Sequence, residues 1–345
     1  MPDYSLIFIQ GGGIVMKKLL ALILTFILAM SMVACNGSSN PKDESITISI
    51  ASLKGPTSIG LVNLYNRSDN NETTNKYNYT IAGAADEISP KLISGEIDIA
   101  AVPCNLASVL YNKTEGEVVV AAVNTLGVLY ILGKNVTDIN AEDPSLESLK
   151  GKTIYTTGQG TTPEYTLRYL LQSAGIDPDK DVTIEFLSEA SEVVSKISTL
   201  DSAVVMLPQP YATVAMTQDE NLKILFDVTN EWNRLNTDST VVTGVVVARK
   251  SFITEHEAAF KAFLEEYRES AALANTDVEG TATLVENYDI FKAAIAKKAI
   301  PYCNIVYIDG TDMKNKISSY LTVLFNANAA SVGGTLPADD FYYIP

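Results

Sequence analysis

Two stretches of the sequence decide the fold: Ile97–Val109, IDIAAVPCNLASV, and Ser202–Val214, SAVVMLPQPYATV. A shift of 105 residues superimposes them and brings a proline, an alanine and a valine onto identical residues. Each stretch has a short apolar run typical of a buried strand, then a proline, then a helical pattern. The same strand and helix at two places indicate an internal duplication.

The duplication extends beyond these stretches. Without a gap, residues 48–109 align with 153–214, and nine of the 62 pairs are identical. Each copy has the order strand, helix, strand, helix, strand, which is typical of a parallel α/β sheet. The sequence therefore predicts an α/β protein with two lobes. Strands are expected at 46–50, 77–82 and 97–102 in the first copy and at 153–157, 182–187 and 203–207 in the second.

Two apolar, β-branched segments are expected to connect the lobes. Residues 117–134 lie between the copies, and residues 240–249 follow the second copy. Each is predicted to be a strand that crosses between the lobes, so that the pair forms a hinge. The last third of the chain is mostly helical in pattern and is expected to cover the first lobe; its helices are expected at 255–274, 278–287, 290–298 and 312–326.

The composition excludes several classes of protein. The 345 residues include 25 Lys+Arg, 41 Asp+Glu, one His and three Cys, with a net charge of −16. An acidic chain does not neutralise phosphates, so no nucleic-acid partner is expected. The one histidine, His256, cannot build a Cys₂His₂ site or a HExxH site, and neither a metal nor a cofactor is expected. The sequence also has no GxSxG, P-loop or CxxC motif.

The N-terminal residues are predicted to be an export signal. Lys17 and Lys18 precede a 14-residue apolar run, which is shorter than the ~20 residues of a spanning helix. The small residues before Cys35 resemble a bacterial lipobox, which would make Cys35 the lipidated first residue of the mature chain. Residues 36–44 are polar and turn-rich, as a tether should be. An ordinary signal peptide or a short membrane anchor is the alternative.

Residues 1–15 precede this signal and do not belong to it. Three glycines lie shortly before Met16, where their codons would suit a ribosome-binding site, so translation is expected to begin at Met16. Peptides from residues 1–15 in cells would contradict this expectation. Removal of residues 1–34 leaves 23 basic and 40 acidic residues and a net charge of −17.

The arrangement resembles a type II periplasmic-binding-protein fold, with two lobes, a two-strand hinge and a ligand cleft between the lobes. Within this fold the chain is similar to the NMT1/SsuA-like receptors of ABC importers, which bind taurine and other sulfonates, nitrate or thiamine-pyrimidine precursors. The stretches that carry the resemblance are IASLKGPTSIG (50–60), GEIDIAAVPCNLASVLYNK (95–113), NTLGVLYIL (124–132), KTIYTTGQGTTPEYTLRYLL (152–171) and VVMLPQPYATVA (204–215). The expected segments are an extension plus signal peptide at 1–34, a tether at 35–44, lobe 1 at 45–132, lobe 2 at 133–243 and a return to lobe 1 at 244–345.

The candidate ligand-binding residues follow strands, because open α/β sheets bind ligands beyond the carboxyl ends of their strands. Glycines in the two first-strand turns let backbone approach a ligand, and the positive helix ends there favour an anion. The candidates are Lys54, Thr57 and Ser58 in one turn, Thr157, Gln159, Thr161 and Thr162 in the other, and Asn105, Gln209 and Tyr211 after the third strands. Plain turn and N-cap chemistry is the alternative for the threonines. Helix capping and lobe packing are the alternative for Asn105, Gln209 and Tyr211.

A few further residues are weaker candidates. Asn124 and Thr125 end the strand before the first crossing, and Thr243 lies in the return crossing; they would touch ligand or only shape the hinge. Trp232 is the only tryptophan, and its side chain would either line the cleft or pack in the core. Cys104 is expected at the cleft rim and Cys303 in a late loop; free thiols are the expectation, and a disulfide between the two stays open.

The resemblance implies a monomeric, exported receptor that is lipid-anchored to the outer face of the cytoplasmic membrane, or to its periplasmic side where an outer membrane exists. The receptor would capture a small anionic solute by hinge closure and present it to an ABC permease and its ATPase, without acting as an enzyme. Two alternatives stay open: an enzyme on the same fold, similar to thiamine-pyrimidine synthases or menaquinone-pathway proteins, and a sensor lipoprotein without transport. The sequence does not name the ligand.

Overall fold

The computed structural model describes residues 46–140, 144–236 and 238–344. The predicted signal peptide, the lipidation site Cys35 and the tether lie outside these residues. Within the described part of the chain, no helix combines the length and the apolar character needed to cross a membrane.

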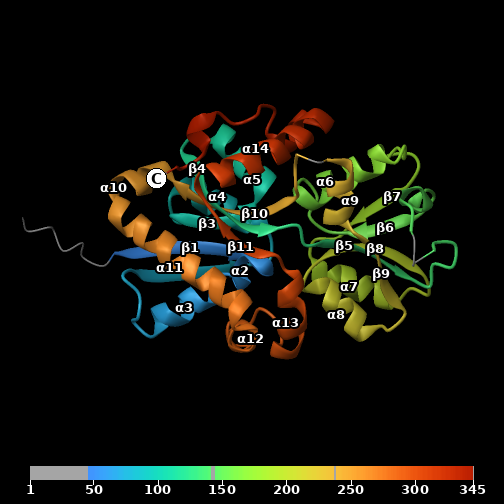
Figure 1. The fold of residues 1–345 in the computed structure, drawn as a ribbon, viewed down its shortest axis with the longest axis horizontal. Coiled ribbons are helices and arrows are strands. Elements are labelled where there is room, and N and C mark those ends of the chain that lie inside the picture. Colours follow the sequence, from blue (N-terminus) through green and yellow to red (C-terminus); the bar gives the residue numbers. More distant parts are fainter. Residues whose placement is uncertain (1–45, 141–143, 237, 345) are drawn as a thin grey trace, which may run out of the picture. The chain divides into compact units, whose positions relative to one another are not determined.

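Two mixed sheets form the framework of the fold (Figure 1). The larger sheet has the strand order β11-β4-β10-β3-β1-β2. In it, β1 runs parallel to β2 and β3, whereas β10 runs antiparallel to β3 and β4. Its strands are β1 (Thr47–Leu53), β2 (Lys76–Ala82), β3 (Ile99–Pro103), β4 (Val118–Leu126), β10 (Val242–Arg249) and β11 (Ile305–Ile308).

The smaller sheet has the order β7-β6-β8-β5-β9. Here β6 runs parallel to β7 and β8, and β5 runs antiparallel to β8 and β9. Its strands are β5 (Leu129–Lys134), β6 (Thr153–Thr156), β7 (Thr183–Phe186), β8 (Ala203–Pro208) and β9 (Leu222–Asp227). All six strands predicted from the duplication are present in the two sheets.

The two sheets repeat one arrangement. The order β2-β1-β3-β10 in the larger sheet corresponds to β7-β6-β8-β5 in the smaller one, each with three parallel strands and one antiparallel strand. The gap-free alignment is wrong in the first strand, however. Ile50 pairs with Tyr79, whereas Ile154 pairs with Ile184, so β1 and β6 correspond at a shift of 104 residues while β2 and β7 keep 105. The first-strand turns are therefore not equivalent residue by residue.

The chain crosses between the sheets twice. It leaves β4 at Leu126 and enters β5 at Leu129, so the predicted strand at 117–134 is two strands joined by a short crossing. The predicted return strand does not cross, because β10 lies wholly in the larger sheet and pairs with β3 on one side and β4 on the other. The return is made between α9 (Val228–Leu235) and Val242.

Helices cover both faces of each sheet, which gives four apolar clusters. One face of the larger sheet packs against α2 (Pro56–Ile59), α3 (Val62–Asp69), α10 (Lys250–Glu255), α11 (Glu257–Thr276), α12 (Val278–Asn287) and α13 (Ala293–Ala299). The other face packs against α4 (Ser89–Ser94), α5 (Cys104–Lys113) and α14 (Gly310–Ala327). The smaller sheet lies between α6 (Thr162–Ser173) on one face and α7 (Ala190–Ser198) and α8 (Tyr211–Gln218) on the other.

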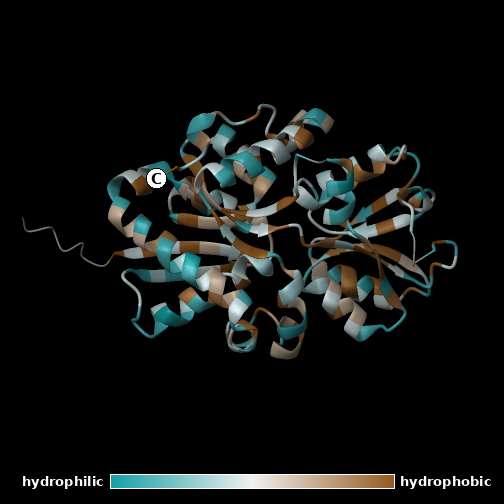
Figure 2. Cartoon of the chain, in the orientation of Figure 1, coloured by the Kyte–Doolittle hydropathy of each residue, from teal (hydrophilic) through white to brown (hydrophobic). Residues whose placement is uncertain are grey.

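This double covering explains the apolar runs in the sequence. A strand buried on both faces carries apolar residues on both, so it reads as a continuous run rather than an alternation. In β4, Val119 belongs to one cluster of the larger sheet and Val120 to the other. Figure 2 shows the strands largely in brown, whereas the surrounding helices alternate between teal and brown.

Candidate functional site

A cavity of about 800 Å³ lies where the carboxyl ends of parallel strands from both sheets meet. Its wall contains Lys54 after β1, Pro103 at the end of β3, Thr157 after β6 and Pro208 at the end of β8. Small-molecule sites usually measure about 300–1,000 Å³, and in α/β folds they lie at this edge of the sheet. The cavity is therefore the candidate binding site.

The structure brings most of the predicted site residues into this wall. The predicted residues that line the cavity are Lys54, Thr57, Thr157, Gln159, Thr161, Thr162, Tyr211 and Thr243. The cavity wall does not include Ser58, Asn105, Asn124, Gln209 and Trp232, which are buried inside the protein.

The two first-strand turns differ in length. In the first, only Lys54 and Gly55 separate β1 from α2, whereas residues 157–161 separate β6 from α6. Gly55 has φ 150° and Gly158 has φ 81°, backbone conformations that favour glycine. The turns share their place in the fold but present different atoms to the cavity.

The threonines in these turns do not cap the helices that follow. Thr57 Oγ1 donates a hydrogen bond back to the carbonyl of Leu53 (2.9 Å), and Thr161 Oγ1 donates to the carbonyl of Gly158 (2.7 Å). Neither α2 nor α6 has a side-chain cap at its N-terminus. The first-turn N–H groups of α6, which begins in the cavity wall, thus keep the partial positive charge of an uncapped helix end.

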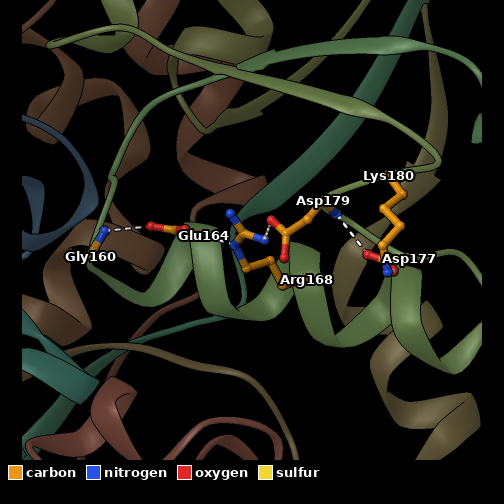
Figure 3. Close-up of polar contacts among 6 residues, drawn as sticks. All are labelled: Gly160, Glu164, Arg168, Asp177, Asp179 and Lys180. Carbon is orange, nitrogen blue, oxygen red and sulfur yellow. Dashed lines mark hydrogen bonds and ion pairs between the residues drawn. The ribbon is translucent and has the colours of Figure 1, made fainter.

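A chain of ion pairs, absent from the sequence-based expectations, fixes the second turn (Figure 3). The N–H of Gly160 donates to the Glu164 carboxylate (2.7 Å), which also accepts from Arg168 Nε (2.7 Å). Arg168 binds Asp179 as well (2.8 Å), and the two carboxylates raise the pKa of its guanidinium against the effect of burial. Glu164 therefore occupies one backbone donor that a ligand anion would otherwise use.

Asn105 and Gln209 use their side chains inside the protein. Asn105 donates to the carbonyl of Ser331 (2.9 Å) and accepts from Thr162 Oγ1 (3.1 Å). Gln209 Oε1 accepts from the hydroxyl of Thr213 (2.7 Å). Both residues hold the helices that follow β3 and β8 in place, which positions the cavity wall without contacting its interior.

Ser58 and Trp232 are also packing residues. Ser58 Oγ lies 2.7 Å from Ser52 Oγ and donates to the carbonyl of Leu53 (2.6 Å). Trp232 is completely buried, with its ring centroid 4.8 Å from Tyr169 and 5.1 Å from Tyr320.

Cys104 does not lie at the cleft rim as expected. It is fully buried and free, and Cys303 is likewise buried and free. The sheet separates them, since Cys104 belongs to the cluster on one face of the larger sheet and Cys303 to the cluster on the other. The expectation of free thiols is therefore confirmed.

Thr125, which the sequence placed with Asn124 at the end of the strand before the first crossing, lies beside Thr243 in the cavity wall at the end of β4. Among the described residues, neither the Thr125 hydroxyl nor the Thr243 hydroxyl has a hydrogen-bond partner, although both atoms are buried. Gly244 is adjacent: a Cβ there would lie 2.9 Å from Thr57 Cγ2 and 3.3 Å from Thr125 Cβ. Thr125 and Thr243 thus add two hydroxyls without partners to the cavity wall.

Comparison with known proteins identifies the family. The model described as the NMT1-like family matches residues 70–286, which is more than half of the chain. The chain belongs to the NMT1-like family. No curated protein matches it in sequence.

Solved structures share the fold of this NMT1-like chain. An ABC transporter protein from Parabacteroides distasonis aligns with TM-score 0.70 and 24% identity over 87% of this chain and 98% of that one. The periplasmic aliphatic sulphonate binding protein SsuA from Escherichia coli aligns with TM-score 0.69 and 17% identity over 87% and 92%. The zinc-bound ligand-binding component of an ABC-type import system from Staphylococcus aureus aligns with TM-score 0.68 and 15% identity over 87% and 97%. These likenesses confirm the predicted two-lobed type II periplasmic-binding-protein fold.

The cavity of this NMT1-like chain combines charges of both signs with an apolar wall. Lys54 and Lys113 line it, as do Asp86 and Glu189. Gly83 follows β2 of the larger sheet, and Glu189 precedes α7, which covers the smaller sheet. A Cβ placed on Gly83 would lie only 2.8 Å from Glu189 Oε1, so this carboxylate packs against the backbone at Gly83. Burial, and secondarily the charge of Glu189, raise the pKa of Tyr211, whose phenol therefore stays protonated and able to donate a hydrogen bond.

Proposed function

We propose that this NMT1-like chain is the solute-binding receptor of an ABC importer and captures a small organic anion in the cavity between its sheets. Its family, its likeness to the aliphatic sulphonate binding protein of Escherichia coli and the place of the cavity support this function. In this role the ligand is bound, enclosed by movement of the two sheets and released unchanged.

The observation that carries the proposal is the pair of hydroxyls without partners at Thr125 and Thr243. A buried polar group without a hydrogen-bond partner costs about 1–3 kcal/mol, which ligand oxygens that accept hydrogen bonds from these hydroxyls would recover. Lys54 lines the same cavity, and its ammonium makes no ion pair or hydrogen bond within the described residues. Hydroxyl donors, an unpaired ammonium and the uncapped start of α6 together favour an anionic group.

A cationic ligand such as the zinc of the staphylococcal protein is less well supported. Among the described residues, no group of three or more His, Cys, Asp or Glu side chains could hold a metal ion. Zinc and other transition-metal ions are bound by such groups of side chains, so the described residues do not favour a metal ligand.

An apolar wall favours an organic solute over a small inorganic anion. The apolar side chains around the cavity include Leu106, Leu129, Phe186 and Leu187. Nitrate would leave this surface in contact with water, whereas the chain of an organic acid would cover it.

The receptor function also accounts for the chemistry of the wall. Of the residues described as lining the cavity, none is a histidine or a cysteine. General acid–base catalysis and thiol chemistry most often rely on these side chains. We therefore infer that the protein is a receptor rather than an enzyme on the same fold.

Export and anchoring complete the proposal. Lipidation of Cys35 would hold the monomeric receptor at the outer face of the cytoplasmic membrane, where an ABC permease and its ATPase would receive the solute. Metabolic palmitate labelling tests the anchor: wild type should be labelled and membrane-bound, whereas Cys35→Ser should be unlabelled. Label that persists in the Cys35→Ser protein would contradict lipidation at this residue.

A thermal-shift screen tests the ligand site. Sulfonates, small carboxylates, nitrate and thiamine precursors are compared for their effect on the melting temperature of the wild type. The stabilising ligand should lose most of its effect in Thr125→Val and Thr243→Val, because valine keeps the shape but not the hydroxyl. Thr283→Val, an exposed change whose hydroxyl donates only to its own helix, is the control. Equal stabilisation of all three variants would exclude this site.

A further inference from the structure

Part of the cavity is lined by side chains of α4 and α5, and this part is called the α4–α5 groove. Pro90 and Ile93 come from α4, and Leu106, Leu110 and Lys113 come from α5. The spacings of four and seven residues along α5 place its three side chains on one face of the helix. The lining residues of α5 therefore extend from its first turn, at the sheet edge, to its last residue.

The inner part of this groove is apolar. Ile93 is 51% exposed, which is unusual for a large aliphatic side chain in the wall of a cavity. Leu106 is half-buried beside it. An apolar ligand chain in the groove would remove both surfaces from water.

Unpaired ammonium groups lie near both ends of this path. Lys54 directly follows β1 at the sheet edge, where α5 also begins after Pro103. Lys113 is the last residue of α5, and nine residues at 1.5 Å per residue put it about 14 Å from Cys104 along the helix axis. Within the described residues, neither lysine makes a side-chain ion pair or hydrogen bond.

A lysine at a helix end has an ordinary role, because its charge compensates the negative end of the helix dipole. That role does not require the side chain to line the cavity, as Lys113 does. Lys91, on α4 nearby, shows the contrast: it is exposed and unpaired but does not line the cavity.

We infer that the ligand is an elongated organic anion with an acidic group at each end of an apolar chain. One acidic group lies at Lys54 and the strand ends, the chain follows the α4–α5 groove, and the second acidic group lies at Lys113. This assignment rests on the proposed receptor function and specifies its ligand class.

Paired probes test the second anionic position. Straight-chain dicarboxylates and alkane disulfonates are titrated calorimetrically into the full-length protein, each beside the monoacid of the same chain length. We expect the best diacid to bind about fivefold or more tightly than its monoacid, in line with one additional ion pair. Lys113→Gln should remove this advantage, whereas Lys91→Gln should leave both the advantage and monoacid binding unchanged.

The apolar groove is tested with a second pair of variants. Ile93→Ser should weaken the binding of long-chain monoacids and diacids more than the binding of short-chain ones. Ile224→Ser, which alters another exposed isoleucine outside the cavity, should have no such effect.

The outcomes separate this inference from the proposed function. Monoacids and diacids that bind equally, or a diacid advantage that survives Lys113→Gln, would overturn the second anionic position and leave the receptor intact. Failure of every acid to bind would overturn the anionic ligand itself and this inference with it.

Discussion

Asn105 and Thr162 share a buried hydrogen bond that joins the two sheets. Thr162 Oγ1 donates to Asn105 Oδ1 at 3.1 Å, and neither residue has any exposed surface. Asn105 lies in the first turn of α5, which follows β3 of the larger sheet, whereas Thr162 is the first residue of α6, which follows β6 of the smaller one. Further along α6, Thr166 Oγ1 lies 2.8 Å from the hydroxyl of Tyr320 on α14. On this side of the cavity the two parts of the fold are held by buried polar contacts.

Removal of either partner should therefore destabilise the protein. Asn105→Ala and Thr162→Val each leave a buried polar atom without a partner, at a cost of about 1–3 kcal/mol in the free energy of unfolding. Because the residues contact each other, the double variant should cost less than the sum of the single ones. Denaturant unfolding of the three variants measures this coupling. Strictly additive losses would mean that the hydrogen bond contributes nothing.

Trp232 should report on this contact between the sheets. It is the only tryptophan and is completely buried against Tyr169 of α6 and Tyr320 of α14. If the contact persists when the cavity closes on a ligand, tryptophan emission and its protection from acrylamide should not change on ligand binding. Trp232→Ala should cost about 3–5 kcal/mol of stability. A red-shifted emission in the presence of ligand would show instead that the contact opens.

The two described thiols should be inert in the folded protein. Burial raises the pKa of both the Cys104 and Cys303 thiols, so almost no reactive thiolate forms at neutral pH. Maleimide treatment followed by peptide mass spectrometry should leave both cysteines unlabelled in the native state and label both in denaturant. Recovery of a disulfide-linked Cys104–Cys303 peptide would contradict the buried, separate positions.

Stability should depend on pH through Asp219 and Lys134. Lys134 is buried at the end of β5, and its Nζ lies 2.8 Å from the Asp219 carboxylate. The hydrogen bond from Lys134, followed by that from the Asn221 N–H, lowers the pKa of Asp219. The stabilisation is therefore present above the ordinary aspartate pKa of about 3.9 and is lost as pH falls through the lower folded value.

Asp219→Asn should consequently lower the melting temperature at neutral pH, and the difference from wild type should shrink as the solution becomes acidic. Melting curves from neutral pH to pH ~2 measure the trend. Asp201→Asn is the matched control, since the Asp201 side chain is exposed and makes no described ion pair. A difference that stays constant down to the lowest pH would exclude ionisation of Asp219 as its cause.

The sequence predicted the main strands because most of them are covered by helices on both faces. Apolar runs such as those of β3 and β8 stand out for that reason. Two strands were missed. β9 (LKILFD) mixes charged and apolar residues, and β11 has only four residues, so neither gives a clear pattern.

The site could be located from the sequence but not resolved into ligand contacts. Strand ends followed by glycine and threonine marked the right edge of both sheets. Whether a polar side chain faces a ligand depends on partners distant in sequence, as the bond between Asn105 and Ser331 shows. The sequence offered Asn124 and Thr125 together, and only the structure shows that Thr125 lines the cavity and Asn124 does not. Lys113 was missed because only the folded helix places it in the cavity wall.

Binding of an organic anion in the cavity is tested most directly by equilibrium dialysis of the purified protein against labelled sulfonates and carboxylates. At least one organic anion should bind at one molecule per chain. Lys54→Gln should weaken the affinity for this anion about fivefold or more. Lys76 is exposed, makes no described ion pair and lies outside the cavity, so Lys76→Gln should leave the affinity unchanged. The absence of any bound anion, or equal affinity in wild type and Lys54→Gln, would contradict anion capture at this site.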